Sequence, residues 1–252
     1  MMHVQGLWRH PVKSLRGESL DAAQITEDGL RGDRRWGVRD DATGMVLTGR
    51  REPRLLGASA ALDADGAVEI SLPNGTTTTG GGPATDAALT SWLGQEVSLL
   101  HAADSPGGHA EFFADATDDS SEAVEWTMPV GRFVDAMPIL LLTTASLRAG
   151  AALYPDGNWD VRRFRPNILV HTDEEGWVED EWCDRIVRIG EVELRPRQPC
   201  VRCTMVTRPQ PDLERDLDIY KTLARHHEGT FGVWATVQTP GVIQVGDKVE
   251  VA

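Results

Sequence analysis

Short apolar segments separated by turn-forming residues run along the whole chain, and most of them have the length of β-strands. Residues 68–72 alternate apolar and polar side chains and end at Pro73-Asn74-Gly75, which is typical of a half-buried strand followed by a turn. Residues 138–142 are instead almost continuously apolar, as in a buried strand. Further strands are expected at residues 34–39, 45–48, 97–100, 168–170 and 231–237, and residues 4–12 form an apolar segment that Pro11 interrupts. Residues 187–192 are expected to form a hairpin with Gly190 in its turn, and residues 242–251 to form strands around a turn at Gly246-Asp247.

Few segments have helical character, and each follows a residue whose side chain can accept a hydrogen bond from the first helical turn. The expected helices are residues 87–93 after Thr85 or Asp86, residues 143–153 with Thr143 or Thr144 as the cap, and residues 213–225 after Asp212. Strands outnumber these short helices and do not alternate regularly with them. The pattern therefore predicts a mostly β fold with α (α+β), built from β-barrels rather than a doubly wound sheet.

Two stretches show neither the apolar alternation of a strand nor the apolar period of a helix. Residues 76–82 read T-T-T-T-G-G-G and lack a following G-K-[ST], so we expect an exposed loop and no phosphate-binding loop. Residues 102–125 are rich in aspartate and glutamate and poor in aliphatic residues, and we interpret them as a linker or mobile loop. We place the domain boundary there, with a first domain at 1–120 and a second at 121–252. Residues 1–35 can still pack with the second domain.

Composition narrows the class of protein. The 252 residues carry a formal net charge of -14, which argues against nucleic-acid binding because that requires a positive field. No apolar run reaches the roughly 18 residues of a membrane span, and no signal peptide is visible at the start. With three cysteines, too few for a disulfide scaffold, the expected compartment is the cytoplasm. Lysine is rare, which gives Lys13 more weight than its residue type usually has.

Cys200 and Cys203 flank Arg202 and form the most reactive-looking stretch of the sequence. A guanidinium beside a thiol stabilises the thiolate, which attacks electrophiles and binds soft metals. Electrostatics alone does not choose between the two cysteines. A pair of ordinary core cysteines is an equally simple interpretation of an isolated C-x-x-C. A complete zinc site needs about four ligands, and only Cys183 remains, so we do not expect zinc.

Taken together, several short motifs resemble the MOSC superfamily, and more closely its amidoxime-reducing components. Their order and spacing cover nearly the whole length of the chain. In the first half they are Pro11-Val12-Lys13-Ser14, Gly29-Leu30 with Asp33-Arg34-Arg35-Trp36, and Thr48-Gly49-Arg50 before Pro53-Arg54-Leu55. In the second half they are Phe164-Arg165-Pro166-Asn167, Glu179-Asp180-Glu181-Trp182, Cys200-Val201-Arg202-Cys203, Phe231-Gly232, Pro240-Gly241 and Val245-Gly246-Asp247.

The resemblance implies a MOSC β-barrel plus an N-terminal β-barrel-like domain, and a pyranopterin molybdenum cofactor (molybdopterin). It implies that Cys203 ligates the molybdenum. Lysine and arginine suit the anionic parts of such a cofactor, and an asparagine can donate and accept at a pterin edge. The superfamily also carries an association with pyridoxal phosphate binding. The positions that match the family's cofactor contacts are Lys13, Ser14, Arg34, Arg165, Asn167 and Arg202.

The sequence departs from the family pattern at three positions. Met137 stands where the family has a small hydroxyl residue, Val201 where serine is common, and Trp234 where the family has tyrosine. These departures concern the polarity of the substrate pocket more than cofactor binding. The chain also has no further cysteines for an iron–sulfur cluster. The electrons are therefore expected from a separate donor protein, either a ferredoxin or a cytochrome- or flavoprotein-type reductase.

We therefore expect a molybdenum-dependent oxidoreductase that reduces small N-hydroxylated compounds by two-electron cleavage of the N–O bond. Its protons come from water or from an acid near the metal, for which Asp180 is the candidate; the alternative for Asp180 is a structural hydrogen-bond acceptor. A rival hypothesis is a carrier of the cofactor or of sulfur, with Cys203 as a persulfide site. A third is a redox dithiol formed by Cys200 and Cys203.

Overall fold

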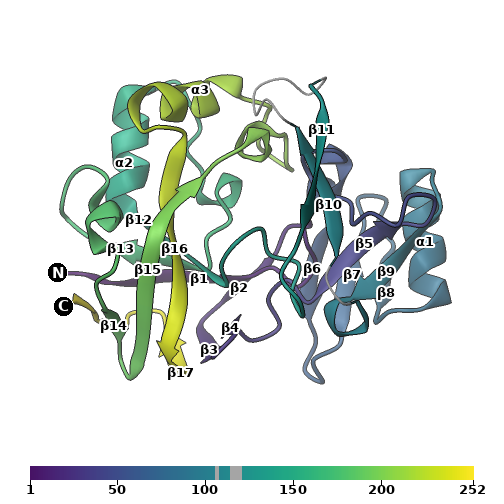
Figure 1. Ribbon diagram of the computed structural model, residues 1–252, viewed down its shortest axis with the longest axis horizontal. Helices are drawn as coiled ribbons and strands as arrows, with labels where there is room; N and C mark the ends of the chain where they lie inside the picture. The colour runs from purple at the N-terminus through teal and green to yellow at the C-terminus, as the bar shows by residue number, and fades with distance from the viewer. Residues whose placement is uncertain (106–107, 114–120) are drawn as a thin grey trace.

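One eight-stranded sheet contains strands from both ends of the chain. The computed structural model describes residues 1–105, 108–113 and 121–252. Strand β1 (His3–Arg9) pairs antiparallel with β13 (Ile168–His171), so the N-terminal strand lies among C-terminal strands. Both termini lie at the same end of the molecule (Figure 1). The strand order is β18 (Val249–Val251), β14 (Val187–Ile189), β15 (Val192–Val201), β16 (Thr230–Thr239), β12 (Ile139–Thr143), β13, β1 and β2 (Glu18–Leu20).

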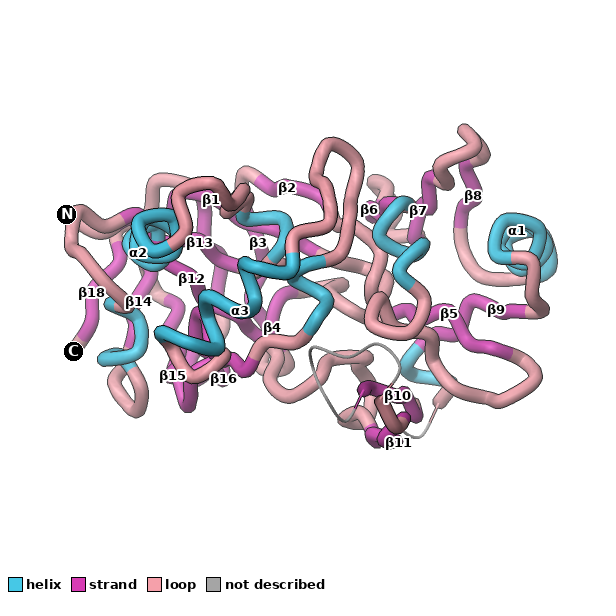
Figure 2. The backbone as a smooth tube through the Cα atoms, turned by 90° about the horizontal axis from the view of Figure 1, so that it is seen from above, coloured by secondary structure: helices cyan, strands magenta, loops and turns pink. Residues whose placement is uncertain are grey.

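The two faces of this sheet bury different hydrophobic cores. Successive side chains of a strand point to opposite faces, so Leu141 of β12 joins one core and Leu142 the other. On the Leu142 side the sheet is covered by α2 (Thr144–Leu153) and α3 (Leu217–His226) (Figure 2). Helix α3 contributes Ile219 and Leu223 to the core on this side. On the other side lies the small sheet β17-β3-β4 (Gly241–Gln244, Ala22–Thr26 and Gly29–Leu30).

The helix caps agree only partly with the sequence prediction. Thr143 caps α2 as predicted, because its side chain accepts a hydrogen bond from the Ser146 N–H. Helix α3 was expected after Asp212, but it begins after Asp216, whose carboxylate accepts from the Asp218 N–H. Helix α1 (Pro83–Leu93) starts directly after Gly82 and has no side-chain cap, so the predicted start at residue 87 was four residues late.

The remaining strands build a second region around α1. Strand β5 (Trp36–Asp40) pairs with β9 (Val97–His101), and β6 (Ser59–Leu62), β7 (Val68–Ser71) and β8 (Thr77–Thr79) form an antiparallel sheet. Their shared core includes Val38, Ile70 and Leu89. Strand β8 lies in the threonine stretch that the sequence predicted to be an exposed loop. That prediction was wrong because β8 is an edge strand held by backbone pairing with β7, which needs no apolar pattern.

The acidic stretch 102–125 also differs from the predicted linker. Strands β10 (His109–Phe113) and β11 (Ala123–Thr127) form an antiparallel hairpin within it. A backbone hydrogen bond of 2.7 Å from Val46 N to His109 O ties the hairpin to the first half of the chain. Ala110 of the hairpin is buried in a small hydrophobic core with Val46 and Phe133, and cross-strand backbone pairing joins β10 to β11. Residues 106–107 and 114–120 of the predicted linker lie outside the described residues.

The predicted fold class is confirmed, since the described residues form three α-helices among many short strands. Strand β15 shows what sequence periodicity does not reveal. Its pairing with β16 shifts register between Pro196 and Gln198 and again between Pro199 and Val201, as expected where proline cannot donate to the ladder. These shifts bend the strand and bring Cys200 and Cys203 to its end. Within the described part of the chain, no helix is long and apolar enough to cross a membrane.

Candidate functional site

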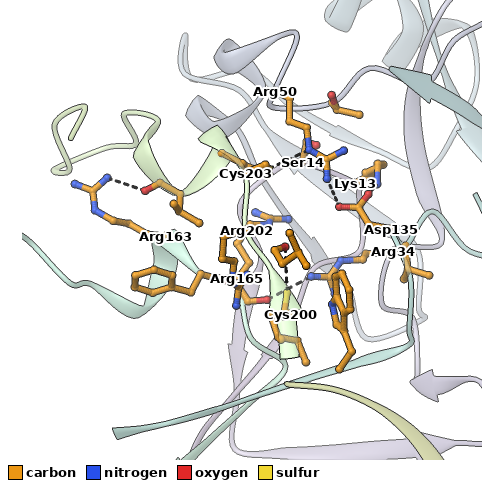
Figure 3. A pocket seen from close by; sticks show the side chains of 18 of the residues that line it. Lys13, Ser14, Arg34, Arg50, Asp135, Arg163, Arg165, Cys200, Arg202 and Cys203 are labelled. Carbon is orange, nitrogen blue, oxygen red and sulfur yellow. Dashed lines mark hydrogen bonds and ion pairs between the residues drawn. The ribbon is translucent and has the colours of Figure 1, made fainter. Parts of the chain in front are cut away.

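A cavity between the two halves of the chain collects most of the residues that the sequence singled out. Seven of them line it: Lys13, Ser14, Arg34, Arg165, Asn167, Arg202 and Cys203 (Figure 3). The lining also includes Arg50 and Asp135, which the sequence prediction did not select. The cavity encloses about 100 Å³, less than the roughly 300–1,000 Å³ of common ligand sites. A larger ligand must therefore displace side chains or extend into the mouth.

Cys203 has an arginine at its sulfur, but that arginine is Arg50. The Arg50 Nε–H donates to Cys203 Sγ at 3.1 Å, and Nη2 donates to Asp135 at 2.5 Å. The Asp135 carboxylate and the Cys203 sulfur together raise the pKa of Arg50 above its ordinary value, which keeps the guanidinium charged beside the sulfur. A charge-assisted hydrogen bond of this kind stabilises a thiolate.

Arg202 does not have the role that the sequence suggested. Its buried guanidinium donates from Nε to the Phe231 carbonyl at 2.8 Å and from Nη1 to the Phe164 carbonyl at 3.0 Å. Arg202 therefore joins β16 to the turn before Arg165, and its guanidinium donates to backbone rather than to a thiolate. Among the described residues its guanidinium donates to neither neighbouring sulfur, which corrects the expected direct role, although its charge still lowers the pKa of Cys200 against the effect of burial.

The two cysteines have different environments. Cys200 is 3% exposed, and burial raises its pKa to about 11 although the nearby Arg202 charge opposes this. Cys203 is half-buried and lies on the cavity. The structure thus separates a buried, protonated thiol from an accessible one, a distinction that the C-x-x-C spacing alone does not make.

The cavity has an excess of positive charge. Lys13 donates to Asp135 at 2.6 Å and to the Phe133 carbonyl at 3.1 Å, and burial lowers its pKa despite this partner. Burial and the Arg34 charge lower the pKa of Arg165 to about 9. Arg165 Nη2 is buried and has no hydrogen-bond partner among the described residues. An anionic ligand would relieve this repulsion and supply the missing acceptor.

Asp135 is the carboxylate that balances this charge. Desolvation raises its pKa, but Arg50 and Lys13 outweigh that effect and hold the pKa well below its usual range. The ionised side chain, 40% exposed, therefore lies where an anionic group of a ligand would meet Lys13. A ligand that uses Lys13 must compete with Asp135.

Three residues of the cavity have unusual backbone conformations. Ser14, Arg34 and Arg165 have φ angles of 67°, 50° and 55°, in the left-handed region that residues with a side chain rarely adopt. Such conformations persist only where the surrounding structure enforces them, and they cluster at functional sites. Here they turn a hydroxyl and two guanidinium groups toward one cavity (Figure 3).

Asn167 and Ser14 are partly engaged by the backbone. The Asn167 side chain accepts from Leu140 N at 3.1 Å and donates to the Trp8 carbonyl at 3.3 Å. The Ser14 hydroxyl oxygen accepts from Gly49 N at 2.9 Å. Asn167 is thus a positioning residue for β12 and β1, while Ser14 keeps its hydroxyl hydrogen for a ligand.

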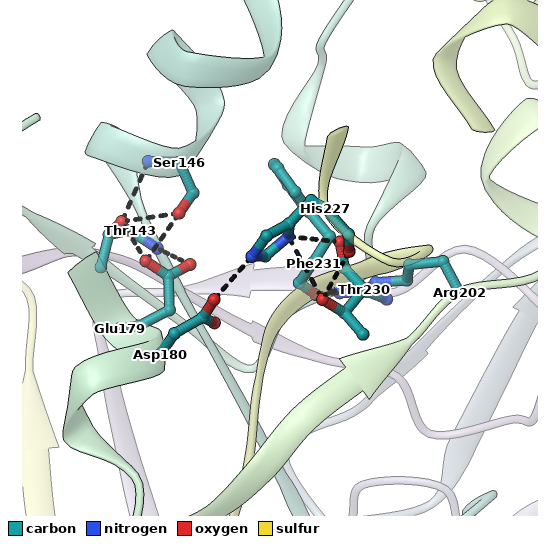
Figure 4. A network of polar contacts seen from close by, with 8 residues as sticks. All are labelled: Thr143, Ser146, Glu179, Asp180, Arg202, His227, Thr230 and Phe231. Atoms are coloured by element: carbon teal, nitrogen blue, oxygen red, sulfur yellow. Dashed lines mark hydrogen bonds and ion pairs between the residues drawn. The ribbon is translucent and has the colours of Figure 1, made fainter. Parts of the chain in front are cut away.

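Asp180 is not brought together with the other predicted residues. It lies in the 3-10 helix η4 (Val178–Trp182), outside the lining of the cavity, and its Oδ2 is 2.6 Å from His227 Nε2 (Figure 4). His227 Nδ1 is 2.8 Å from the Thr230 carbonyl oxygen. Both ring nitrogens face acceptors, so the imidazolium can donate to both. Burial lowers the pKa of His227, but these hydrogen bonds outweigh it and raise the pKa. The geometry favours the structural alternative for Asp180.

The three departures from the family pattern all lie on the cavity. Met137, Val201 and Trp234 contribute to its wall, and Val201 is 63% exposed next to the cysteine end of β15. A substrate that approaches Cys203 therefore meets apolar surface at these positions, in contrast to the charged interior around Lys13.

Comparison with known proteins assigns the family. Residues 1–119 match the model of the MOSC N-terminal beta barrel domain, and residues 129–250 match that of the MOSC domain. Mitochondrial amidoxime-reducing component 1 of Mus musculus is 30% identical over 98% of this chain and 81% of its own length. The chain belongs to the MOSC-domain family. The predicted MOSC β-barrel plus N-terminal barrel domain is thereby confirmed.

Two other relatives are named for amidoxime reduction and for the molybdenum cofactor, and one solved structure shares the fold. Mitochondrial amidoxime reducing component 2 of Bos taurus is 29% identical over 98% of this chain and 82% of that protein. Molybdenum cofactor sulfurase of Drosophila grimshawi is 27% identical over 89% of this chain but only 31% of its own length. The YUAD protein from Bacillus subtilis shares the fold, with a TM-score of 0.50, 13% identity and coverage of 100% of this chain and 96% of that one.

These names support an association with molybdenum cofactor chemistry and leave two smaller expectations unsupported. None of the relatives described above is named for pyridoxal phosphate, so that expectation has no support. Several relatives are named as mitochondrial, and the cytoplasmic location of this chain stays a prediction. In the described residues, no group of three or more His, Cys, Asp or Glu side chains is gathered for a metal. A metal at Cys203 would need its other ligands from elsewhere, and a metal-bearing anionic cofactor fits this set of cations and one thiol.

Proposed function

We propose that this MOSC protein is a molybdenum-cofactor-dependent reductase of small N-hydroxylated compounds. The observation that carries the proposal is the contact between Arg50 Nε and Cys203 Sγ at the edge of the cation-lined cavity. It places one accessible cysteine sulfur, with a guanidinium donor on it, beside a site for an anion. Relatives named amidoxime-reducing components, which align with 98% of this chain, support the same activity.

Cys203 would bind the metal, while Lys13, Arg34 and Arg165 would hold the anionic part of the cofactor. Arg165 is the strongest candidate of these three, because its Nη2 is buried and finds no hydrogen-bond partner in the described part of the chain. Ser14 would donate its hydroxyl hydrogen, and the Asn167 side chain would tie the backbones of β12 and β1 together behind the site. When bound, the molybdenum cofactor supplies the two-electron chemistry that cleaves an N–O bond.

The side chains of the cavity also limit how protons reach the substrate. Reduction of R–NH–OH to R–NH₂ and water consumes two electrons and two protons. Asp135 is held ionised by Arg50 and Lys13, so it is an acceptor rather than an acid. Asp180 is hydrogen-bonded to His227 outside the cavity. We therefore assign the protons to water that enters at the exposed edge near Asp135, which is 40% exposed.

The electrons require a separate protein. The sequence has three cysteines, of which Cys203 is the proposed ligand and Cys200 is buried, so the chain cannot hold a cysteine-ligated iron–sulfur cluster. We propose a ferredoxin or a cytochrome- or flavoprotein-type reductase as the donor. The net charge of -14 favours a donor with a basic docking face, since complementary charge accelerates association.

The alternative is a carrier that holds the cofactor or sulfur, with Cys203 as a persulfide site. A relative named molybdenum cofactor sulfurase favours it, although this chain matches only 31% of that protein's length. The carrier and the reductase use the same thiol. They differ in whether substrate is turned over.

The deciding experiment combines metal analysis with an activity assay. The chain would be produced in a host that makes the cofactor, and its molybdenum content and benzamidoxime reduction by an artificial electron donor would be measured. We expect about one molybdenum per chain and turnover in the wild type, loss of turnover in Cys203→Ser, and retained metal and activity in Cys200→Ser. A persulfide on Cys203 without wild-type turnover would establish the carrier instead. Equal loss of activity in both variants with molybdenum retained would refute the ligand assignment.

A further inference from the structure

A network of polar contacts runs from η4 to the cysteine end of β15, through residues that the proposed reaction does not use (Figure 4). Asp180 Oδ2 lies 2.6 Å from His227 Nε2. The other carboxylate oxygen of Asp180, Oδ1, is buried and has no hydrogen-bond partner among the described residues. Trp177, which precedes η4, stacks on the same imidazole with ring centroids 4.2 Å apart. The His227 ring is therefore held in one orientation from the η4 side.

On its other side the imidazole holds a turn. His227 Nδ1 lies 2.8 Å from the Thr230 carbonyl oxygen, and the Thr230 hydroxyl donates to the His227 carbonyl at 2.9 Å. Between them, Glu228 has a φ angle of 50°, in the left-handed region that residues with a side chain rarely adopt. Such a conformation persists where the surrounding contacts enforce it. The contacts of the imidazole are part of what fixes this turn.

The carbonyls of the turn are the acceptors that hold Arg202. The Arg202 backbone N–H donates to the Gly229 carbonyl at 2.8 Å, and the side-chain Nε donates to the Phe231 carbonyl at 2.8 Å. These two carbonyls flank the Thr230 carbonyl in the chain, which the imidazole contacts. The position of the imidazole is therefore passed on to both the backbone and the guanidinium of Arg202.

Arg202 connects the turn to two parts of the cofactor cavity. Its Nη1 donates to the carbonyl of Phe164 at 3.0 Å, and Phe164 directly precedes Arg165. Cys203 follows Arg202 in the chain, so a shift of the Arg202 backbone also shifts the cysteine. Arg165, Arg202 and Cys203 all line the cavity. A movement of the turn would therefore displace a cation and the thiol of the cavity together.

We propose that Asp180 and His227 are positioning residues, which hold Arg202 in place and through it the shape of the cofactor cavity. This inference rests on the proposed function, because it takes the cavity as the cofactor site. The imidazolium is the form that can do this, since only the charged ring has an N–H for the Asp180 carboxylate and another for the Thr230 carbonyl. A neutral ring would release one of the two.

The groups around the ring favour the imidazolium. Burial lowers the pKa of His227, but its hydrogen bonds and the charges of Asp180 and Glu179 outweigh that effect and raise the pKa. Glu179 is buried and accepts from the Thr143 and Ser146 hydroxyls, and burial raises its own pKa. Asp180 is therefore the main ionic partner of the imidazolium. Its removal should lower the pH at which the ring loses its second proton.

The test of the geometry is an NMR titration of the full chain without cofactor, labelled with ¹⁵N. We expect the Arg202 Nε–H signal to shift with the same inflection as the His227 ring, above about pH 6.5. In Asp180→Asn both inflections should move to lower pH, and in His227→Gln the Arg202 signal should stay constant in this range. Arg163 is the internal control, because its buried side chain donates from Nε to the Asn158 carbonyl outside the network. Its signal should not follow the His227 titration.

The effect on the cavity is measured as the molybdenum retained after gel filtration of protein made in a host that supplies the cofactor. Asp180→Asn and His227→Gln should each lower retention about three- to tenfold, the range expected for one lost hydrogen bond. Asp180→Glu, which keeps the carboxylate, should restore part of it. Ile70→Val is the matched control, because it lowers stability through the separate core around α1. It should retain molybdenum as the wild type does, and thermal unfolding would show that each variant folds.

An Arg202 signal that stays constant while His227 titrates would overturn the proposal. Retention at the wild-type level in both Asp180→Asn and His227→Gln would also overturn it, as would an equal loss in Ile70→Val. Failure of the proposed function would instead appear as wild-type protein that binds no molybdenum or turns over no substrate. The titration needs neither metal nor turnover, so in that case it alone decides whether the network positions Arg202.

Discussion

The unequal environments of the three cysteines lead to a quantitative prediction for their alkylation. An ordinary cysteine has a pKa near 8.5, so roughly a tenth of it is thiolate at pH 7.5. Burial raises the pKa of Cys200 to about 11, which leaves about 1 in 3,000 ionised at that pH. Ionisation alone then slows Cys200 about 300-fold relative to an ordinary thiol, and its 3% exposure slows it further. Burial also raises the pKa of Cys183.

Cys203 should therefore be the first cysteine that iodoacetamide modifies. Peptide mapping by mass spectrometry at pH 7.5, on protein without cofactor, should show Cys203 reacting at least about 100-fold faster than Cys200. Arg50→Gln removes the hydrogen bond from Nε to the sulfur, an interaction of 3.1 Å. Hydrogen bonds to charged groups contribute about 1.5–3 kcal/mol, so the Cys203 rate should fall about tenfold or more. The Cys203 rate in Arg50→Lys, which keeps the positive charge, should lie between the rates in the wild type and in Arg50→Gln.

Cys200→Ser is the matched control, and it should leave the Cys203 rate within about twofold. Labelling in denaturant should make all three cysteines react at similar rates, which would show that the difference belongs to the fold. Comparable labelling of Cys200 and Cys203 in the native protein would refute the burial reasoning. An unchanged Cys203 rate in Arg50→Gln would refute the role given to Arg50.

Three further predictions concern the surroundings of the site. Lys13→Ala should lower molybdenum retention after gel filtration about tenfold, because it removes a donor to the anionic part of the cofactor. Asp135→Asn should raise retention, because it removes a carboxylate that competes for Lys13. Equal losses of molybdenum in the two variants would contradict this. His227 has a raised pKa, so its contribution to stability is complete below about pH 6.5 and is lost as pH rises through the folded-state pKa; Asp180→Asn should flatten that part of a melting-temperature profile. Gly232→Ala should lower the melting temperature by several degrees, since Gly232 has φ 73° and a Cβ there would lie 2.6 Å from the Leu141 carbonyl; an unchanged melting temperature would contradict it.

The sequence predicted the elements that depend on local apolar pattern. The run at 138–142 became β12, and Thr143 caps α2 as its hydroxyl allows. It failed where backbone pairing decides the structure, as in β8 and in the hairpin of β10 and β11. In β8 the partner strand supplies the hydrogen bonds, so a polar segment becomes a strand without an apolar signature. Strand β11 does carry apolar residues at Val124 and Trp126, but the acidic composition around it hid that short pattern.

The site was predictable as a set of residues but not as a set of contacts. Motif order brought Lys13, Arg34 and Arg165 to attention, and all three line the cavity. The partner of Cys203 could not be found in this way, because Arg50 is 153 positions away in sequence. Arg202 was misjudged because its acceptors are backbone carbonyls, whose positions depend on the path of the chain. Thr48-Gly49-Arg50 was part of the family pattern, and that pattern was the available signal for Arg50.

Asp135 balances part of the positive charge in the cavity. Buried cations that lack a partner cost several kcal/mol each, yet Lys13 and Arg50 both contact this one carboxylate. Binding of an anionic group is therefore an exchange, in which the ligand replaces Asp135 and the displaced carboxylate, already 40% exposed, gains water. Arg165 takes no part in this exchange, because its Nη2 has no partner to give up within residues 1–105, 108–113 and 121–252. Arg165 should thus contribute most to affinity, while Lys13 and Asp135 set how readily the ligand enters and leaves.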